Sequence, residues 1–312
     1  KEIHAEQHQL VLEKDGQQNI QPYSKLVLAV GANPIRLAIA GDGSDDIHVV
    51  NNLNDYKKFR ENLAIREDKR VVILGAGLIG CEFANDLQNT EHQVTVIDLA
   101  ARPLGRLIPE YVSSSFQEKL EHIGIHFVLG TTVEKIIKIE KGDYQITLAN
   151  GQSVIADIVL SAIGLQPNLE LAQAADILCS RGIVTNVLLE TNQADIYAIG
   201  DCAEVNGLLL PYVMPIMQQA RALAKTLNGE HTQVHYPAMP VAVKTPTAPL
   251  TVLPAPIDVD VTWTTEELED GMIAKATDQQ DTLRGFVLLG ATAAKQRLTL
   301  TKLVPDLIPA SV

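Results

Sequence analysis

The sequence predicts an α/β protein in which one strand–helix–strand domain is inserted into another, with antiparallel meanders and a smaller α+β domain at the C-terminal end. Three observations predict this fold class. A glycine-rich turn joins two apolar runs between residues 70 and 98. The ending of one strand, near residue 30, is repeated near residue 163. The composition changes after residue 234, where prolines and short strand-like runs become frequent.

The first part of the chain is predicted to form an antiparallel meander that leads into a buried strand. Apolar residues at positions 10–12 precede the turn dipeptide Asp15-Gly16, and a second apolar run covers residues 25–30. Asp-Gly between two strand-like runs is a strong signal for a hairpin. The helix expected after residue 51 should place four apolar residues on one face: Leu53, Tyr56, Phe59 and Leu63.

The glycine-rich turn has the pattern of a dinucleotide-binding site. A strand precedes it, a helix follows it, and the next strand ends in Asp98 at the spacing typical of this motif. Gly75 permits the tight turn, Gly77 lets the backbone approach a pyrophosphate, and Gly80 lets the helix pack closely on the strand. The phosphates would lie at the helix N-terminus, which favours anions. Because Asp98 can accept both ribose hydroxyls of NAD and would repel the 2′-phosphate of NADP, we expect an NADH site.

Helices and strands with regular apolar spacing follow this turn. Phe116, Leu120 and Ile123 recur at helical spacing, and Gly124 is expected to cap that helix. The predicted elements are helices over residues 80–89 and 110–123, a strand over 125–129, and a second meander of strands over 133–139, 144–148 and 153–163.

The two meanders end in the same way. Residues 29–34 read Ala-Val-Gly-Ala-Asn-Pro, and residues 162–167 read Ala-Ile-Gly-Leu-Gln-Pro. A strand–helix–strand unit precedes the second copy, whereas the chain begins inside the first copy. We therefore expect the intact protein to carry another glycine-rich turn about 60 residues before Lys1. The repeat also makes Gly31 and Gly164 equivalent positions.

A later strand ends in an acidic residue. The apolar residues 196–199 lead to Gly200 and Asp201. Ligands of open α/β sheets bind outside the carboxyl ends of strands, which favours a ligand contact for Asp201. An aspartate at this place can equally cap a helix, and spacing alone leaves both interpretations open. A helix is predicted over residues 216–228, with Pro215 at its first position.

The last segment is predicted to be a separate α+β domain. Its expected elements are strands over residues 239–244, 250–253, 259–263, 272–276 and 284–289 and a final helix over 291–303. We divide the chain into four parts: the first part of one Rossmann-like domain (1–40), the inserted Rossmann-like domain (41–165), the second part of the first domain (166–234) and the C-terminal domain (235–312).

Charge and cysteine content exclude several classes of protein. The formal net charge of −13 argues against nucleic acids and anionic membrane surfaces as partners. Cys81, Cys179 and Cys202 show no metal or disulfide spacing, so we expect reduced thiols in a cytoplasmic protein and no metal site. No apolar run reaches the ~18 residues of a membrane span, so membrane insertion is not expected.

These segments resemble the pyridine-nucleotide-dependent flavoprotein reductases. The resemblance rests on residues 28–32, 75–82, 162–164 and, most specifically, 197–201. It implies FAD and NADH as cofactors, each bound by one of the two nested Rossmann-like domains. Three further segments are similar to the rubredoxin reductases of alkane-oxidising bacteria: residues 212–215, 219–224 and 240–246.

The resemblance implies a role for each site residue. Asp201 would bind the ribityl chain of FAD, and Val213 and Met214 would lie beside the flavin ring. The helix that follows would point its N-terminus at the N1–C2=O edge of the ring, where negative charge develops on reduction. Glu82 would stand where nicotinamide meets flavin. Lys244 is either a strand-edge lysine or a donor to a flavin oxygen, and the resemblance favours the second. Three strand-ending glycines would belong to the cofactor sites: Gly31, Gly164 and Gly200.

The leading hypothesis is an NADH-dependent flavoprotein reductase that passes electrons through FAD to rubredoxin in alkane hydroxylation. Flavin suits this task because nicotinamide delivers two electrons together and a single iron accepts one. Two alternatives remain open: the ferredoxin-type reductase of a dioxygenase system, and an NADH- and FAD-binding redox-sensing flavoprotein. Residues 1–312 alone are expected to hold FAD weakly or not at all and to show little activity, because the pyrophosphate half of the FAD site would lie in the upstream turn.

Overall fold

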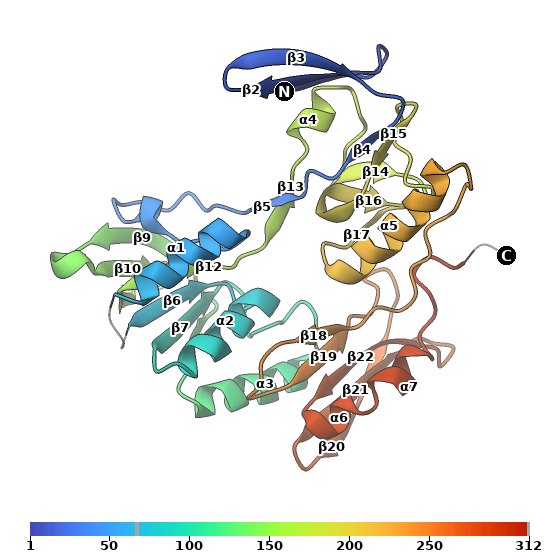
Figure 1. The fold of residues 1–312 in the computed structure, drawn as a ribbon. Coiled ribbons are helices and arrows are strands. Elements are labelled where there is room, and N and C mark those ends of the chain that lie inside the picture. Colours follow the sequence, from blue (N-terminus) through green and yellow to red (C-terminus); the bar gives the residue numbers. More distant parts are fainter. Residues whose placement is uncertain (66–68, 311–312) are drawn as a thin grey trace. The chain divides into compact units, whose positions relative to one another are not determined.

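The computed structural model describes residues 1–65 and 69–310, so residues 66–68 of the predicted inserted domain and the last two residues of the predicted C-terminal domain lie outside the described residues. The chain divides into two compact units whose elements are labelled in Figure 1. The first unit comprises Lys1–Asn33, Leu165–Met239 and Asp306–Val312, and the second comprises Pro34–Gly164 and Pro240–Pro305. The second unit thus holds both the predicted inserted domain and most of the predicted C-terminal domain.

A four-stranded parallel sheet in the order β12-β6-β7-β8 forms the centre of the second unit. Its strands are β6 (Arg70–Leu74), β7 (Gln93–Asp98), β8 (His126–Leu129) and β12 (Ile158–Ser161). Successive side chains of a strand point to opposite faces. Val71 and Ile73 therefore enter one core, while Val72 and Leu74 enter another. Burial on both faces explains why this strand is apolar at every one of these positions.

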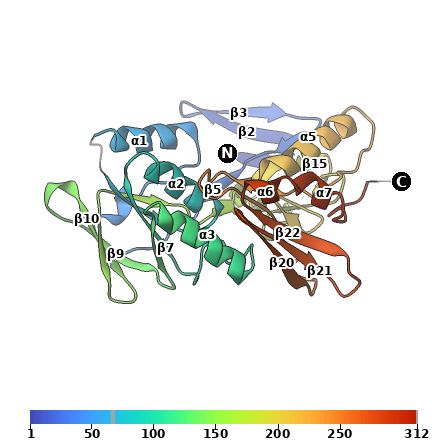
Figure 2. The same ribbon diagram turned by 90° about the horizontal axis from the view of Figure 1, so that it is seen from below.

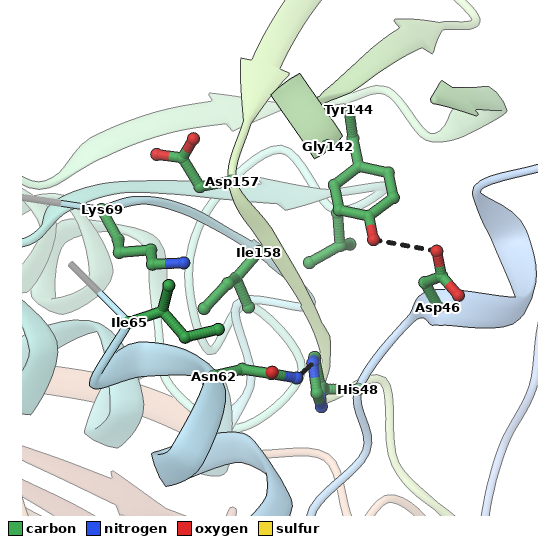
Figure 3. Close-up of a pocket in the computed structure, with 10 residues that line it drawn as sticks. Asp46, His48, Asn62, Ile65, Lys69, Gly142, Tyr144, Asp157 and Ile158 are labelled. Carbon is green, nitrogen blue, oxygen red and sulfur yellow. Dashed lines mark hydrogen bonds between the residues drawn. The ribbon is translucent and has the colours of Figure 1, made fainter. Parts of the chain in front are cut away.

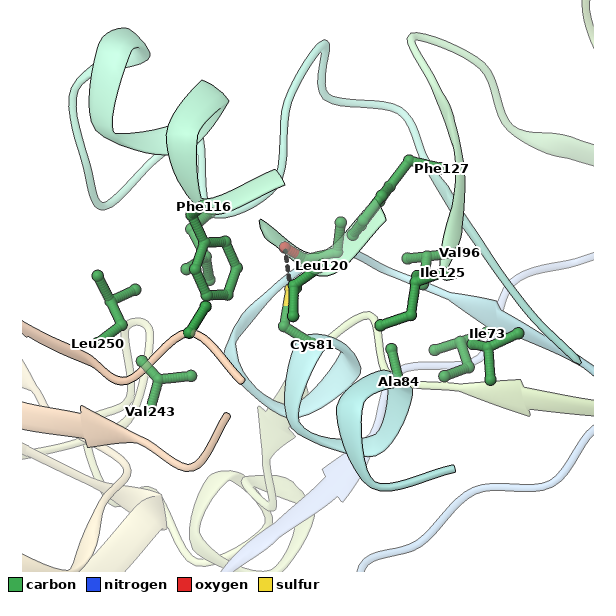
Figure 4. Packing of buried hydrophobic residues seen from close by; sticks show 14 of the residues in the cluster. Ile73, Cys81, Ala84, Val96, Phe116, Leu120, Ile125, Phe127, Val243 and Leu250 are labelled. Atoms are coloured by element: carbon green, nitrogen blue, oxygen red, sulfur yellow. Dashed lines mark hydrogen bonds between the residues drawn. The ribbon is translucent and has the colours of Figure 1, made fainter. Parts of the chain in front are cut away.

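Helices cover one face of this sheet and an antiparallel meander covers the other. Figure 4 shows Cys81 and Ala84 of one helix near Phe116 and Leu120 of another, in the core that contains Ile73. The helices of this segment are α1 (Leu53–Leu63), α2 (Leu78–Gln88) and α3 (Glu110–His122), with short 3₁₀ turns η1 (Ser44–Asp46) and η2 (Glu140–Gly142). The meander on the opposite face has the order β11-β10-β9 and consists of β9 (Val133–Lys138), β10 (Tyr144–Leu148) and β11 (Ser153–Ala156).

A five-stranded antiparallel sheet packs against the same helices. Its order is β18-β19-β22-β21-β20. Val243 and Leu250 of this sheet belong to the core that contains α2 and α3, as Figure 4 shows. The strands are β18 (Val241–Val243), β19 (Leu250–Leu253), β20 (Thr262–Leu268), β21 (Gly271–Thr277) and β22 (Leu283–Leu289), followed by the short helices α6 (Ala291–Ala294) and α7 (Arg297–Thr301). The shared core places this sheet in the second unit.

The first unit has its own core around several small sheets. Figures 1 and 2 both show β2 and β3 side by side in the N-terminal meander. The strands are β1 (Glu2–His4), β2 (Gln9–Lys14), β3 (Gln17–Pro22), β4 (Leu26–Leu28), β14 (Ile183–Thr185), β15 (Ile196–Ala198), β16 (Ala203–Val205) and β17 (Leu208–Leu209). The helical elements are α4 (Glu170–Gln173), η3 (Gly200–Cys202) and α5 (Val213–Leu227). Strand β4 pairs in parallel with β15, so the predicted buried strand ends beside Gly200.

The repeated strand endings make equivalent contacts. Strand β5 (Ala32–Pro34) pairs with β13 (Leu165–Pro167) in a two-stranded sheet. Gly31 and Gly164, which precede these strands, both have positive φ angles, 68° and 113°. The backbone N–H of Asn168 donates to the oxygen of Gly31 at 3.0 Å, and that of Ile35 donates to the oxygen of Gly164 at 3.0 Å. Each donor lies four positions after the glycine of its own copy, so the contacts of the two endings are reciprocal.

Only half of the apolar face predicted for the first long helix is buried. Phe59 and Leu63 of α1 are buried, but Leu53 is 79% exposed and Tyr56 is also exposed. Helix α1 begins after Asn52, whose side chain accepts the N–H groups of the first turn. That turn extends into solvent, so spacing alone overstates how much of the helix is covered.

Three predicted boundaries also differ from the structure. Helix α5 starts at Val213, which makes Pro215 its third residue; its missing N–H is harmless anywhere in the first turn. The predicted final helix is two short helices, because the N–H groups of Lys295 and Gln296 bond three residues back and tighten the turn between them. Strand β20 lies later than predicted, because this edge strand is largely exposed and lacks an apolar alternation.

The last strand of the second meander is interrupted at Asp157, which turns toward Arg70. The two Oδ atoms of Asp157 accept hydrogen bonds from the backbone N–H of Arg70 at 2.7 Å and from its guanidinium at 2.8 Å. Burial raises the pKa of Asp157, but the bonds from Arg70 outweigh it and hold the pKa at about 2. A second carboxylate, Asp143, accepts from the same guanidinium at 2.6 Å.

Replacing Asp157 with Asn is expected to lower the free energy of unfolding at pH 7 by about 1–3 kcal/mol, because a charged hydrogen-bond acceptor is lost. A carboxyl whose pKa is lowered in the folded state stabilises the protein above its unfolded pKa. This stabilisation is lost as the pH falls from about 4 toward the folded value of about 2. Denaturant unfolding between pH 7 and pH 2 measures it. A gap between wild type and variant that stays constant down to pH 2 contradicts this account.

Candidate functional site

The glycine-rich turn follows β6 and begins α2. At Gly75 the φ angle is 106°, and an added Cβ would lie 2.6 Å from the carbonyl oxygen of Ala162. At Gly80 an added Cβ would overlap the carbonyl oxygen of Gly75. Around Gly77, by contrast, none of the described residues places an atom within 4 Å of an added Cβ. The fold itself thus explains two of the glycines, while the third leaves open space at the start of α2.

Asp98 ends β7 beside this turn, as its spacing predicts. Its Oδ2 accepts the N–H of Ala76 at 2.5 Å, and its Oδ1 accepts the N–H of Ala100 at 2.7 Å. A carboxylate offers about four acceptor positions, so each oxygen keeps one for a ligand hydroxyl. Bracing the turn is a second role for Asp98 that the spacing did not reveal.

Substitutions of Asp98 are expected to separate these two roles. Asp98→Asn keeps one of the two acceptor oxygens that brace the turn but removes the negative charge that disfavours a 2′-phosphate. Discrimination against NADPH should fall about 10-fold or more, with a smaller loss of Tm than in Asp98→Ala. Asp98→Ala should lose the discrimination and also lower Tm. Titration of each variant with NADH and NADPH, beside thermal unfolding, measures both effects. An unchanged NADH preference in both variants excludes a role in ribose recognition.

Glu82 and Lys244 come together, although 162 positions separate them. Glu82, half-buried on α2, accepts the backbone N–H of Lys244 at 2.9 Å through its Oε1. One turn further along α2, Asn85 accepts the backbone N–H of Thr247 at 3.2 Å. The loop after β18 is therefore held along one face of the helix that starts at the glycine-rich turn. The contact uses the backbone of Lys244, whose side chain is exposed, so both interpretations of its ammonium group remain open.

Asp201 lies in η3, directly after β15. Its Oδ1 is buried and has no hydrogen-bond partner among the described residues. Burial raises the pKa of this carboxyl, since a low dielectric disfavours the charged form. The caps of η3 and α5 are Ile199 and Tyr212, so Asp201 caps neither. The ligand interpretation therefore keeps its support: an unpaired buried acceptor suits the hydroxyl groups of a ribityl chain.

The N-terminus of α5 lies in the same unit as Asp201. The cap residue Tyr212 makes no side-chain cap hydrogen bond, so the first N–H groups of this 15-residue helix have no side-chain acceptor. Val213 and Met214 of the first turn are 71% and 49% exposed. Uncapped N–H groups with the positive end of the helix dipole favour an electron-rich ligand edge. Both features fit a flavin ring placed over this turn.

The cysteines show no sign of redox chemistry. Cys81 and Cys202 are fully buried, and burial raises the pKa of Cys81 to about 12 and also raises that of Cys202. Such thiols are poor nucleophiles at neutral pH. Over the described ranges, no group of three or more metal-ligating side chains is found and no helix is long and apolar enough to cross a membrane.

A cleft lies at the end of the parallel sheet where β6 and β12 begin, opposite to the glycine-rich turn. Figure 3 shows Asp157 lining it where β12 begins, whereas the glycine-rich turn follows the other end of β6. Its polar groups bond to one another: the hydroxyl of Tyr144 donates to Asp46 at 2.9 Å, and Asn62 and His48 are joined at 3.0 Å. We therefore assign no ligand to this cleft.

Two known families match successive parts of the sequence. Residues 1–226 match the family described as pyridine nucleotide-disulphide oxidoreductase, and residues 233–304 match the rubredoxin binding C-terminal domain. The chain belongs to the pyridine nucleotide-disulphide oxidoreductase family. The fold class predicted from the sequence, nested Rossmann-like domains with a C-terminal α+β domain, is confirmed.

Individual relatives narrow the comparison. The chain is 77% identical over 313 residues to the Rubredoxin-NAD(+) reductase of Acinetobacter baylyi, covering 100% of this chain and 80% of that protein. It is 42% identical to the Rubredoxin-NAD(+) reductase of Alcanivorax borkumensis, covering 92% of this chain and 74% of that protein. Among solved structures, the ferredoxin reductase for the CYP199A2 system of Rhodopseudomonas palustris superposes with a TM-score of 0.85 at 26% identity, over 98% of this chain and 76% of that one.

Proposed function

We propose that the chain is an NADH-dependent flavoprotein reductase that uses FAD to pass electrons to rubredoxin. The observation that carries the flavin part is the buried Oδ1 of Asp201, which has no hydrogen-bond partner within residues 1–65 and 69–310 and lies in one unit with the start of α5. The rubredoxin part is supported by the C-terminal family match and by the two relatives that share this activity in their names. Alkane hydroxylation as the process served, and the cytoplasm as the location, belong to the same proposal.

The residues of the first unit would hold FAD by hydrogen bonding and electrostatics. Asp201 accepts a ribityl hydroxyl, which supplies its buried oxygen with the missing partner. The N–H groups of Val213 and Met214 face the electron-rich edge of the ring, and their exposed side chains become covered by it. When bound, FAD supplies the conversion between a two-electron hydride and single electrons.

The residues of the second unit would hold NADH. The open space at Gly77 admits the pyrophosphate to the start of α2, and Asp98 accepts the ribose hydroxyls. Glu82 is fixed by the N–H of Lys244 and stays available for the nicotinamide end. Acid–base chemistry by a side chain is not required, so catalysis consists of positioning and electrostatic stabilisation.

Steady-state oxidation of NADH with different electron acceptors tests the proposal. Rubredoxin should support turnover at a kcat/KM well above that of a ferredoxin, and a small dye should serve as the control for flavin reduction alone. Turnover with dye but not with rubredoxin would contradict the rubredoxin assignment. The ferredoxin reductase of similar structure makes ferredoxin the second candidate acceptor, and preference for it in this assay would support that alternative.

A further inference from the structure

Gln219 places a polar amide at a buried position of α5. Gln219 is 2% exposed and lies five positions after Met214, on the part of α5 that faces the core of the first unit. A buried glutamine is costly unless its polar groups are paired. Here both ends are paired, and neither partner lies on the same helix.

The amide of Gln219 joins the flavin-site turn to a distant tyrosine. Its Oε1 accepts the backbone N–H of Gly200 at 2.6 Å. Its Nε2 donates to the hydroxyl of Tyr236 at 2.7 Å. Tyr236 is completely buried, and its own backbone N–H donates to the oxygen of Ile308 at 2.9 Å. We call Gly200, Gln219 and Tyr236 the amide relay.

The relay acts on the Ile199–Gly200 peptide, one peptide before the bond that joins Gly200 to Asp201. The N–H of Gly200 belongs to the peptide that joins Ile199 to Gly200, and Gln219 holds this end. The carbonyl oxygen of Ile199 accepts the thiol of Cys202 at 3.3 Å, which holds the other end. Gly200 has a φ of 82°, a left-handed conformation in which several peptide orientations are open to glycine. Fixing this peptide restricts the backbone at Gly200, the residue that directly precedes Asp201.

We propose that Gln219 is a positioning residue that sets Asp201 and the start of α5 in one geometry for FAD. The relay links the two elements directly. Gln219 belongs to α5, and it accepts the N–H of Gly200, the residue before Asp201. This inference rests on the proposed function, since it assumes that Asp201 contacts FAD. It adds a residue that touches no cofactor itself but determines how tightly the cofactor is held.

Four variants of the holoenzyme test the inference. Gln219→Met removes both bonds at a similar side-chain length and leaves the half-buried N–H of Gly200 without this acceptor, so FAD should bind about 10-fold more weakly or worse. Gln219→Glu keeps an oxygen for Gly200 in either protonation state and should restore most of the affinity. Tyr236→Phe removes only the outer partner and should have a smaller effect. Thr226→Val is the matched control, because Thr226 is buried on the same helix and its hydroxyl bonds Thr232 instead.

The measurements are the dissociation constant of FAD from flavin fluorescence and the melting temperatures of the apo- and holoprotein. A positioning role predicts that Gln219→Met weakens FAD binding while Thr226→Val lowers both melting temperatures without changing FAD affinity. The double variant with Tyr236→Phe should bind FAD no worse than Gln219→Met alone, since the relay acts as one unit. Equal FAD affinity in wild type and Gln219→Met, or equal losses in Gln219→Met and Thr226→Val, overturns the inference. If the intact wild-type protein holds no FAD, the proposed function fails, and the inference fails with it.

Discussion

The Asp201→Asn variant is expected to bind FAD about 100-fold more weakly than the wild-type protein. A charged acceptor bonded to a ligand hydroxyl in a buried place contributes about 1.5–3 kcal/mol, and the neutral amide also presents N–H groups where the ligand donates. Equilibrium titration with FAD, followed by flavin fluorescence, measures the loss. Retention of wild-type affinity would exclude Asp201 from the flavin site.

The same substitution is expected to make the apoprotein more stable at pH 7. Burial raises the pKa of Asp201 in the folded chain. A carboxyl with a raised folded pKa stabilises the protein only at low pH, where it is neutral, and this contribution is lost as the pH rises through the folded pKa. At pH 7 the charged group therefore costs stability, which Asn removes. Thermal unfolding of the apoproteins should show a higher Tm for Asp201→Asn at pH 7 and no gain near pH 3.

Replacing Gly80 with Ala is expected to lower the free energy of unfolding by about 3 kcal/mol, because the new methyl group meets a backbone oxygen that cannot move aside. That oxygen belongs to Gly75, so the glycine-rich turn must shift and NADH binding should weaken as well. Denaturant unfolding and NADH titration measure the two effects. A variant of normal stability would show that the approach of α2 to this turn is less close than described.

Gly77→Ala is the matched control for that experiment. Its methyl group meets none of the described atoms within 4 Å, and the residue has an ordinary φ of −79°, so stability should stay within about 0.5 kcal/mol of wild type. If the pyrophosphate approaches the backbone here, NADH should nevertheless bind about 10-fold more weakly. Normal NADH affinity in Gly77→Ala would place the pyrophosphate elsewhere.

Local signals predicted the glycine-rich turn between β6 and α2 correctly. Gly80 is required by the nearby oxygen of Gly75, and Gly75 adopts a positive φ at the turn. Asp98 arrives beside the turn because neighbouring parallel strands end at the same edge. The apolar spacing around Phe116 was sufficient to predict which face of α3 is buried, because residues three and four apart lie on the same face of a helix. Such features depend on short-range geometry, which sequence patterns record directly.

Features that depend on tertiary partners escaped prediction. Leu53 has a core-like spacing but faces solvent, and no local pattern shows where a covering element stops. Asn85 and Gln219 accept hydrogen bonds from residues in other elements, so their roles appear only when those elements are placed. A polar amide among buried helix positions was the available signal for both. The roles of the site residues themselves remain predictions that the experiments above address.

The reciprocal bonds at the two repeated strand endings have a consequence for how such a chain can arise. The inserted segment is Pro34–Gly164. Near its two ends, the N–H of Ile35 donates to the oxygen of Gly164 at 3.0 Å. Gly31 and Asn168, which flank the insertion in the first unit, are joined in the same way. A gene fragment encoding a whole domain could therefore enter between two neighbouring codons without pulling the recipient fold apart. One hydrogen bond joins the ends of the inserted segment, and the other joins the chain that flanks it. Each segment can therefore keep its own fold within one polypeptide.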